Sequence, residues 1–194
     1  TQEQRAWYAG LSDEAGAASW LAALMKQLLQ PNQEEVNKLK RFVEETMFNR
    51  IQHKDGKDKY GVVKSLFYYD TVAMPQGTYS DSINYKTWSA WNKKEADNIG
   101  RSYNYPHVAA AHWVLYKLSK NYKNLVIEES PNSYLDRAYN TAMAMVEKAP
   151  HYAQFGQMEG SIFLFILQDL EREGLTVQAK NLYAAMYKRA QHWA

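Results

Sequence analysis

The sequence contains no cysteine, so disulfides, thiolate metal sites and cysteine nucleophiles are excluded. Glycine (9 residues) and proline (5 residues) are scarce, which disfavours a fold of short strands and frequent turns. No apolar run approaches the roughly 20 residues of a membrane-spanning helix, and no signal peptide is expected. Neither sign of charge is in excess, with 23 basic and 21 acidic residues. We therefore expect no nucleic-acid partner and no membrane partner.

The chain does contain enough apolar residues for a substantial core. Its 194 residues are 46% hydrophobic and 14% aromatic. A globule of this size buries roughly 70% of the surface of its unfolded chain. We expect a single globular domain over residues 1–194, which is a fragment of a larger protein.

Apolar residues repeat at helical spacing in six segments. These run from about 13 to 29, 32 to 47, 106 to 121, 131 to 146, 158 to 173 and 176 to 190. In the fifth segment the apolar residues occupy most of the circumference, so that helix is expected to be buried on most sides. Short connections between consecutive helices predict antiparallel hairpins. The predicted class is all-α.

Capping residues mark the ends of these segments. Asn32 and Glu35 have the spacing of a capping box, and Ser130 precedes a proline at a first helical position. Gly174 is expected to close the fifth helix in a left-handed conformation, and Thr176 to cap the sixth.

The stretch from about Asp55 to Tyr105 does not fit the helical pattern. It is too long for an ordinary connection, and short strands are possible at Tyr60–Val63 and Leu66–Tyr69. Aromatic residues are crowded in it: Tyr60, Phe67, Tyr68, Tyr69, Tyr79, Tyr85, Trp88, Trp91, Tyr103 and Tyr105. Such rings can stack on sugars while their polar edges form hydrogen bonds. The alternative is that they pin the loop onto the helices as a satellite core.

The segment Arg101-Ser102-Tyr103-Asn104-Tyr105-Pro106-His107 is the densest polar and aromatic cluster. Pro106 at a helix start places Asn104, Tyr105 and His107 near the positive end of the helix dipole. There they could neutralise a carboxylate and move a proton, which is what a polysaccharide lyase requires. The alternative is a helix-capping turn in which His107 is hydrogen-bonded to backbone.

Carboxylates are the second kind of candidate, because glycoside hydrolysis needs a protonated and an ionised carboxyl group. Glu159 enters a nearly all-apolar helix, where poor solvation would favour its protonated form. Asp70 follows a run of aromatic residues, and Asp13 and Glu14 precede the first apolar segment. The alternative for Glu159, Asp13 and Glu14 is a first-turn acid that complements the helix dipole.

No cofactor or metal site is predicted. The segment from His53 to Asp58 lacks the alternating ligands and closing glutamate of a calcium loop. His107 and His112 are five residues apart, off one helical face, so they make no zinc-binding helix motif.

Several of these clusters resemble the C-terminal part of a largely uncharacterised family of long, multidomain proteins with glycoside-hydrolase-like α/α-toroid architecture. The resemblance covers nearly the whole chain, and the Arg101–His107 string is its most specific part. Further matching segments are 13–16, 64–69, 88–93 and 155–160. The resemblance implies a toroid of helical hairpins related to six-hairpin glycosidases, a polysaccharide substrate, and a secreted or periplasmic protein. A closed toroid needs about twelve helices, so the remainder of a larger toroid is a possible partner.

The leading hypothesis is a glycoside hydrolase domain with Glu159 as general acid and Asp70 or Glu14 as the ionised partner. Rings and polar groups would bind the glycan: Tyr68, Tyr69, Trp88, Trp91, Arg101, Tyr103, Asn104, Tyr105 and His107. The second hypothesis is a lyase for uronate-containing glycans, with Tyr105 and His107 transferring protons and Asn104 neutralising the carboxylate. The third is a non-catalytic helical scaffold that binds a sugar or a protein.

Overall fold

A computed structural model describes residues 14–66, 68–82, 91–123, 125, 129–153 and 160–194. The described residues are mostly helical and contain no strand, so the predicted all-α class is confirmed. The helices in chain order are α1 (Glu14–Leu29), α2 (Gln33–Arg41), the π-helix η1 (Phe42–Ile51), α3 (Lys93–Ala96), the 3-10 helix η2 (Ser102–Asn104), α4 (Tyr105–Asn121), α5 (Pro131–Lys148), α6 (Pro150–Ala153), α7 (Ile162–Arg172) and α8 (Thr176–Trp193).

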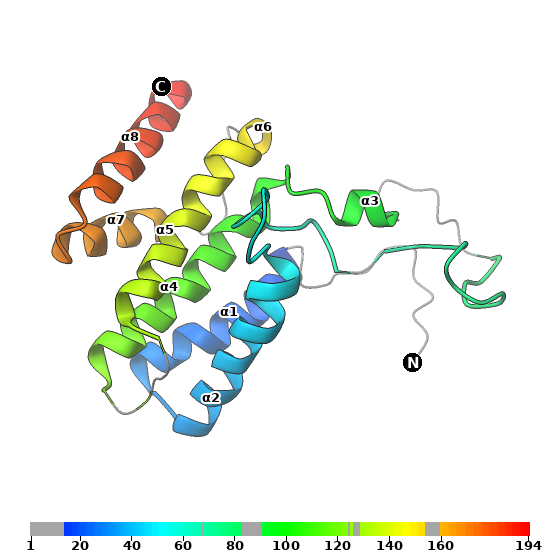
Figure 1. The fold of residues 1–194 in the computed structure, drawn as a ribbon, viewed down its shortest axis with the longest axis horizontal. Helices are drawn as coiled ribbons and strands as arrows, with labels where there is room; N and C mark the ends of the chain where they lie inside the picture. The colour runs from blue at the N-terminus through cyan, green and yellow to red at the C-terminus, as the bar shows by residue number, and fades with distance from the viewer. Residues whose placement is uncertain (1–13, 67, 83–90, 124, 126–128, 154–159) are drawn as a thin grey trace.

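Helix α4 is the centre of the helical body. It lies between α1 and α5, and α7 and α8 are added on the far side of α5 (Figure 1). Every residue from Tyr105 to Tyr116 is buried. The run Ala109-Ala110-Ala111 has no exposed surface, and its small side chains let neighbouring helices approach from several directions.

Helix α7 was expected to be buried on most sides, and this prediction is wrong. Phe163 and Ile166 are buried, but Leu164 and Phe165 remain 45% and 41% exposed. The reason is position: α7 lies at the edge of the body, so the neighbouring helices cover only part of its surface.

The predicted second helix is longer than expected and changes type. Asn32 caps α2 by accepting a hydrogen bond from the Glu35 backbone N–H. After Arg41 the chain continues as the π-helix η1 and ends where the backbone N–H of Gln52 donates to the Met47 carbonyl. Such π-helical turns are uncommon and are often associated with functional sites.

Three other predicted caps have different outcomes. Ser130 caps α5 by accepting from the backbone N–H of Ser133, as expected. Gly174 adopts φ +71, which confirms the left-handed position that ends α7. Thr176 is instead the first residue of α8, and no side-chain hydrogen bond caps that helix.

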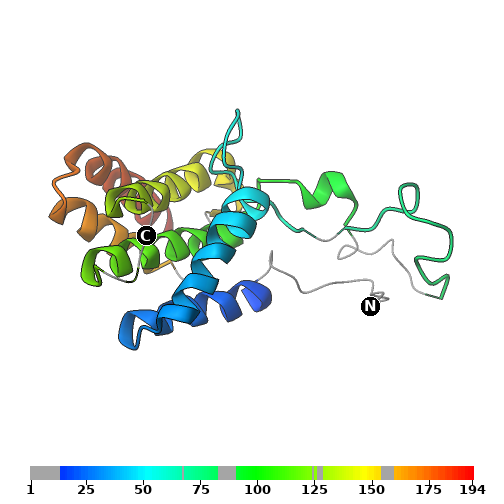
Figure 2. The ribbon, with the colours of Figure 1, turned by 60° about the horizontal axis from the view of Figure 1, so that its bottom comes forward.

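The segment between η1 and η2 is an irregular arm that projects from the helical body (Figures 1 and 2). At its base, residues 51–53 and 60–63 form a turn with one isolated antiparallel bridge, Gln52 to Val62. Further out, the backbone N–H groups of Lys64, Ser65 and Tyr69 donate to the carbonyls of Asn98, Ala96 and Trp91. These contacts hold the outgoing and returning chains together without forming the two strands that were considered possible, among the residues that the structure describes.

Candidate functional site

The base of the arm carries a series of alternating cationic and aromatic side chains. We call it the cation–aromatic ladder, and it consists of Tyr68, Lys93, Lys64, Trp91, Arg101 and Tyr103. Residues 64 and 68 come from the outgoing chain, 91 and 93 from the returning chain, and 101 and 103 from the start of η2. The backbone bond from Tyr69 N–H to the Trp91 carbonyl (2.7 Å) joins the outgoing and returning chains at this point.

Cations lie over ring faces throughout the ladder. The Lys64 Nζ atom is 4.3 Å from the Trp91 ring centroid, on which the Arg101 guanidinium also lies at 5.7 Å. The Arg101 guanidinium is also 5.0 Å from the Tyr103 ring centroid, so it contacts two rings. These are typical cation–π distances, and such contacts fix the orientation of both partners.

The two ends of the ladder reach solvent, whereas its centre does not. Trp91 is 7% exposed under Lys64 and Arg101, but Tyr68 is 44% exposed with Lys93 5.4 Å from its ring. Tyr103 and Arg101 are half-buried. A ligand at this surface would therefore contact ring edges, a ring face and ammonium or guanidinium donors.

Two carboxylates balance the lysines of the ladder. Glu95 accepts from Lys64 at 3.4 Å, and Asp97 pairs with Lys93. The hydrogen bond that the Lys93 ammonium donates to Asp97 raises the pKa of Lys93 above its ordinary value. The surface is therefore polar without carrying a large net charge, which suits a ligand rich in hydroxyl groups better than a polyanion.

The polar cluster at the start of α4 has a different environment from the ladder. Tyr105, Asn104 and His107 are 0%, 1% and 1% exposed. The Tyr105 hydroxyl donates to the Ile99 carbonyl (2.8 Å), and a ring nitrogen of His107 lies 3.1 Å from the Tyr103 carbonyl oxygen. Burial raises the pKa of Tyr105 to about 12.

This burial corrects the role predicted for the three residues. A glycan cannot contact side chains without accessible surface, so their arrangement corresponds to the capping-turn alternative. For the same reason, Tyr105 and His107 are not accessible for the proton transfers proposed for a lyase. What the sequence could not reveal is that the chain before Tyr105 folds across it as η2 and the arm.

The predicted carboxylates do not gather in the described part of the chain. Glu159 and Trp88 lie outside the described residues, and so does the side chain of Glu14, the first residue of α1. Asp70 is in the outer arm, where its Oδ1 accepts from the backbone N–H groups of Val72 (3.0 Å) and Ala73 (2.9 Å). This is the ordinary geometry of an aspartate that closes its own turn.

The remaining predicted ring, Tyr69, supports the same turn. Its ring packs edge to face on Tyr79 with centroids 4.7 Å apart, and the Tyr79 hydroxyl accepts from the Asp70 backbone N–H. Tyr69 therefore contributes to the shape of the outer arm as a ring in a small local cluster.

Two carboxylate clusters lie within the body and were not among the predicted site residues. Arg137 on α5 binds both oxygens of Glu44 (2.9 and 3.1 Å) and also Glu129. Arg137 is only 9% exposed, and a charged residue on the buried face of a predicted helix is a signal that sequence reasoning could have used. Because one guanidinium holds both carboxylates, the cluster resembles a clamp between η1 and α5 more than an acid/base pair.

The second cluster surrounds Asp169, which is 2% exposed on α7. Its oxygens accept from Trp113 Nε1 (2.8 Å), Lys117 Nζ (3.2 Å) and an Arg172 NH group (2.8 Å). A carboxylate with this many donors is fully satisfied and has no free position for a substrate proton. It ties α7 to α4.

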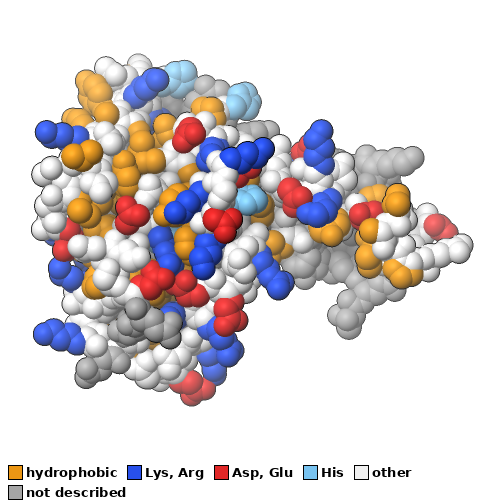
Figure 3. Space-filling model, viewed as in Figure 1, with side chains coloured by type: hydrophobic (Ala, Val, Ile, Leu, Met, Phe, Trp, Pro, Cys, Tyr) orange, Lys and Arg blue, Asp and Glu red, His pale blue; other side chains and the backbone are white. Residues whose placement is uncertain are grey.

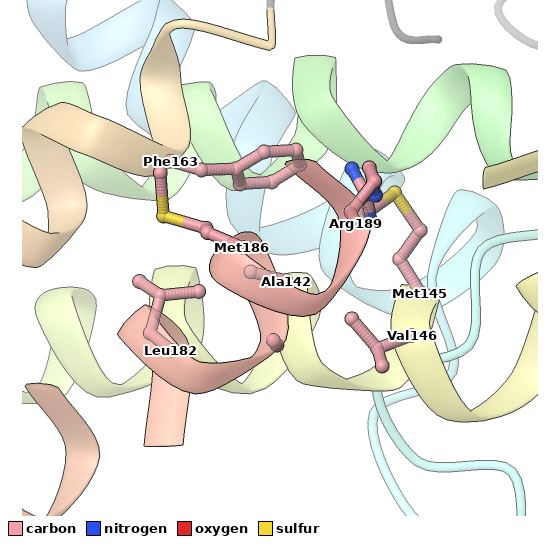
Figure 4. Close-up of a pocket in the computed structure, with 8 residues that line it drawn as sticks. Ala142, Met145, Val146, Phe163, Leu182, Met186 and Arg189 are labelled. Carbon is pink, nitrogen blue, oxygen red and sulfur yellow. The ribbon is translucent and has the colours of Figure 1, made fainter. Parts of the chain in front are cut away.

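Two further observations bear on cofactors and ligands. No group of three His, Asp or Glu side chains with metal-binding geometry exists among the described residues. A small hollow between α5, α7 and α8 is lined by apolar side chains such as Met145, Phe163 and Met186, with Arg189 at its edge (Figure 4). Because its lining contains no carboxylate, this hollow offers no glycosidase chemistry.

Charged side chains of both signs are spread over the face of the body shown in Figure 3, without a large area of one sign. None of the helices in the described part of the chain has the length and apolar character that a membrane span requires.

Comparison with known proteins gives one match. The model of a family of unknown function, DUF5695, matches residues 1–194. No curated protein and no solved structure matches the chain.

Proposed function

We propose that the chain, which belongs to the DUF5695 family, is a carbohydrate-active domain that binds glycan at the cation–aromatic ladder. The observation that carries the proposal is the exposed end of the ladder. There the Tyr68 ring is accessible and Lys93 lies over it, while Arg101 and Tyr103 offer donors and a ring further along. A sugar presents an apolar ring face together with hydroxyl groups, and this surface complements both.

Rigidity of the ladder also supports binding. Trp91 is buried under two cations and its carbonyl is hydrogen-bonded to Tyr69, so the rings are held in place before a ligand arrives. A preformed surface loses less conformational entropy on binding than a flexible one. Because Glu95 and Asp97 balance the lysines, we propose a glycan whose recognition depends on stacking and hydroxyl contacts.

Glycoside hydrolysis is the activity we propose for this domain, with Glu159 as the general acid. Of the two partners predicted for it, Asp70 uses one carboxylate oxygen to close its own turn, which favours Glu14. The pair must stand about 5–9.5 Å apart across the scissile bond.

The test is a glycan-array screen with the labelled 194-residue chain, followed by titration with the best ligand. Tyr68→Ala should weaken binding roughly three- to tenfold, because one ring–sugar contact is lost. Tyr183→Ala is the matched control, since Tyr183 is an even more exposed tyrosine (58% against 44% for Tyr68) on α8, outside the arm. Equal affinities of both variants and the unsubstituted chain would exclude the ladder as the binding surface.

Catalysis is measured separately on the glycan that binds. Glu159→Gln should abolish turnover and leave the affinity unchanged. Loss of binding and turnover together, or of neither, would count against Glu159 as the general acid. Binding without turnover in the unsubstituted chain would leave a glycan-binding scaffold as the function.

A further inference from the structure

The outer face of α8 carries apolar side chains that the rest of the described chain does not cover. Val177, Tyr183 and Tyr187 are 68%, 58% and 53% exposed. The two tyrosine rings stack on each other, with centroids 6.0 Å apart and planes 11° from parallel. The inner face of the same helix is occupied, because Ala179 and Leu182 are buried against α5 and α7.

These exposed residues follow helical spacing along most of α8. Val177 is one heptad before the exposed Ala184, and Tyr187 follows Ala184 by three and Tyr183 by four residues. Positions at these intervals lie on one side of a helix and form an apolar stripe, within which the exposed Lys180, three residues after Val177 and one heptad before Tyr187, separates Val177 from the tyrosine pair. A stripe of this kind is the surface that a second helix packs against.

The charge on α8 is of one sign. The helix contains Lys180, Lys188 and Arg189 and no aspartate or glutamate. Lys180 is exposed within the stripe and Lys188 at its edge, and neither has a carboxylate within ion-pair distance in the part of the chain that the structure describes. Elsewhere in the body, lysines such as Lys26, Lys38 and Lys120 do have acidic partners. In Figure 3, blue and orange side chains lie together at the upper left, where Figure 1 places α8.

We propose that the outer face of α8 binds an acidic amphipathic helix of a partner protein. Leucine-like side chains of the partner would cover Val177, Ala184 and the tyrosine pair. Its flanking carboxylates would pair with Lys188 at the edge and with Lys180, whose long side chain can extend from the stripe to the edge. A second copy of α8 fits poorly, because self-pairing would bring the same cations together. This surface lies outside the ladder, so the proposal does not depend on glycan binding.

The test uses two synthetic 21-residue helical peptides with the same leucine heptad pattern. One peptide has glutamate at the flanking positions and the other has lysine. Each is fluorescently labelled and titrated with the 194-residue chain while anisotropy is recorded. The glutamate peptide should bind at least about tenfold more tightly than the lysine peptide, because like charges across an interface oppose docking.

Two variants locate the binding surface. Tyr183→Ser combined with Tyr187→Ser should weaken binding of the glutamate peptide by about tenfold or more, since buried tyrosines are frequent hot spots. Lys180→Gln combined with Lys188→Gln should weaken it less and reduce its salt dependence. Lys54→Gln, a similarly exposed lysine outside α8, is the control for a change of net charge and should have no effect.

The outcomes that overturn the proposal are distinct. They are equal binding of both peptides, no binding of either, and no response to the tyrosine variant. Concentration-dependent dimerisation in sedimentation that the tyrosine variant abolishes would assign the face to a second copy. Binding to phosphatidylserine vesicles that requires the two tyrosines would assign it to a membrane surface.

Discussion

Two aromatic regions of this chain differ in solvent exposure, although they are adjacent in sequence. At the start of α4, Tyr105 is fully buried and its hydroxyl bonds a backbone carbonyl. In the arm, the ring of Tyr68 is 44% exposed and its neighbour is a lysine. The comparison shows that tyrosine content alone does not identify a binding surface. What matters is whether helices surround the ring.

The largest effect on stability is expected from removing the buried ring, Tyr105. Tyr105→Ala should lower the free energy of unfolding by about 3–5 kcal/mol, because a large cavity is left in the core. Tyr105→Phe should cost only about 1 kcal/mol, since it removes the hydroxyl bond alone. Urea denaturation followed by circular dichroism measures both. A loss below about 1 kcal/mol for the alanine variant would show that the ring is not enclosed as described.

A second prediction concerns pH and the buried histidine of α4. His112 has no exposed surface, and its Nε2 lies 2.8 Å from Gln52 Oε1. Burial, together with the nearby Arg137 charge, lowers the pKa of His112 from 6.5 to about 3. Between these values the unfolded chain binds a proton that the folded chain does not bind. The stabilising contribution of neutral His112 is therefore complete above pH 6.5 and is lost as the pH falls toward 3.

As the pH decreases from 6.5 toward 3, we expect His112 to lower the free energy of unfolding by up to about 1.4 kcal/mol per pH unit. His112→Gln should flatten the dependence between pH 6.5 and 4, even if it lowers stability at neutral pH. His53→Gln is the control, because His53 is only half-buried in the turn at the base of the arm. Identical pH slopes for the His112 variant and the unsubstituted chain would contradict the prediction.

The smallest effect on stability is expected from removing the exposed ring, Tyr68. Tyr68→Ala should change the free energy of unfolding by less than about 0.5 kcal/mol, because no core contact is lost. The same variant is expected to weaken glycan binding, which would separate binding from stability. A loss of stability comparable with that of Tyr105→Ala would show that the arm is part of the core.

The helices were largely predictable because their signals are local. Apolar spacing, the Asn32 cap, the Ser130–Pro131 start and Gly174 all act within a few residues, and each corresponds to a helix end in the structure. The predicted enclosure of α7 was wrong because burial depends on neighbouring helices that come from elsewhere in the sequence. The central position belongs instead to α4, whose alanines allow close approach.

The ladder was only partly predictable. Trp91, Arg101, Tyr103 and Tyr68 were proposed as binding residues from their composition, whereas Lys64 and Lys93 were not. Nothing in the spacing of a lysine shows that it will lie over a ring 25 or 27 residues away in the sequence, as Lys93 and Lys64 do. The turn-closing role of Asp70 is local, but aspartates serve turns and active sites with the same side chain.

The sequence by itself determined that this protein is built from helices, where most of those helices begin and end, and that cysteine chemistry is absent. These properties follow from short-range spacing, capping and composition. The tertiary structure alone decided which aromatic residues are enclosed and which face solvent, and which cations meet which rings. It also decided that Glu44, Glu129 and Arg137 converge. The physical reason is that burial and electrostatic pairing depend on distances between segments far apart along the chain, and only packing sets those distances.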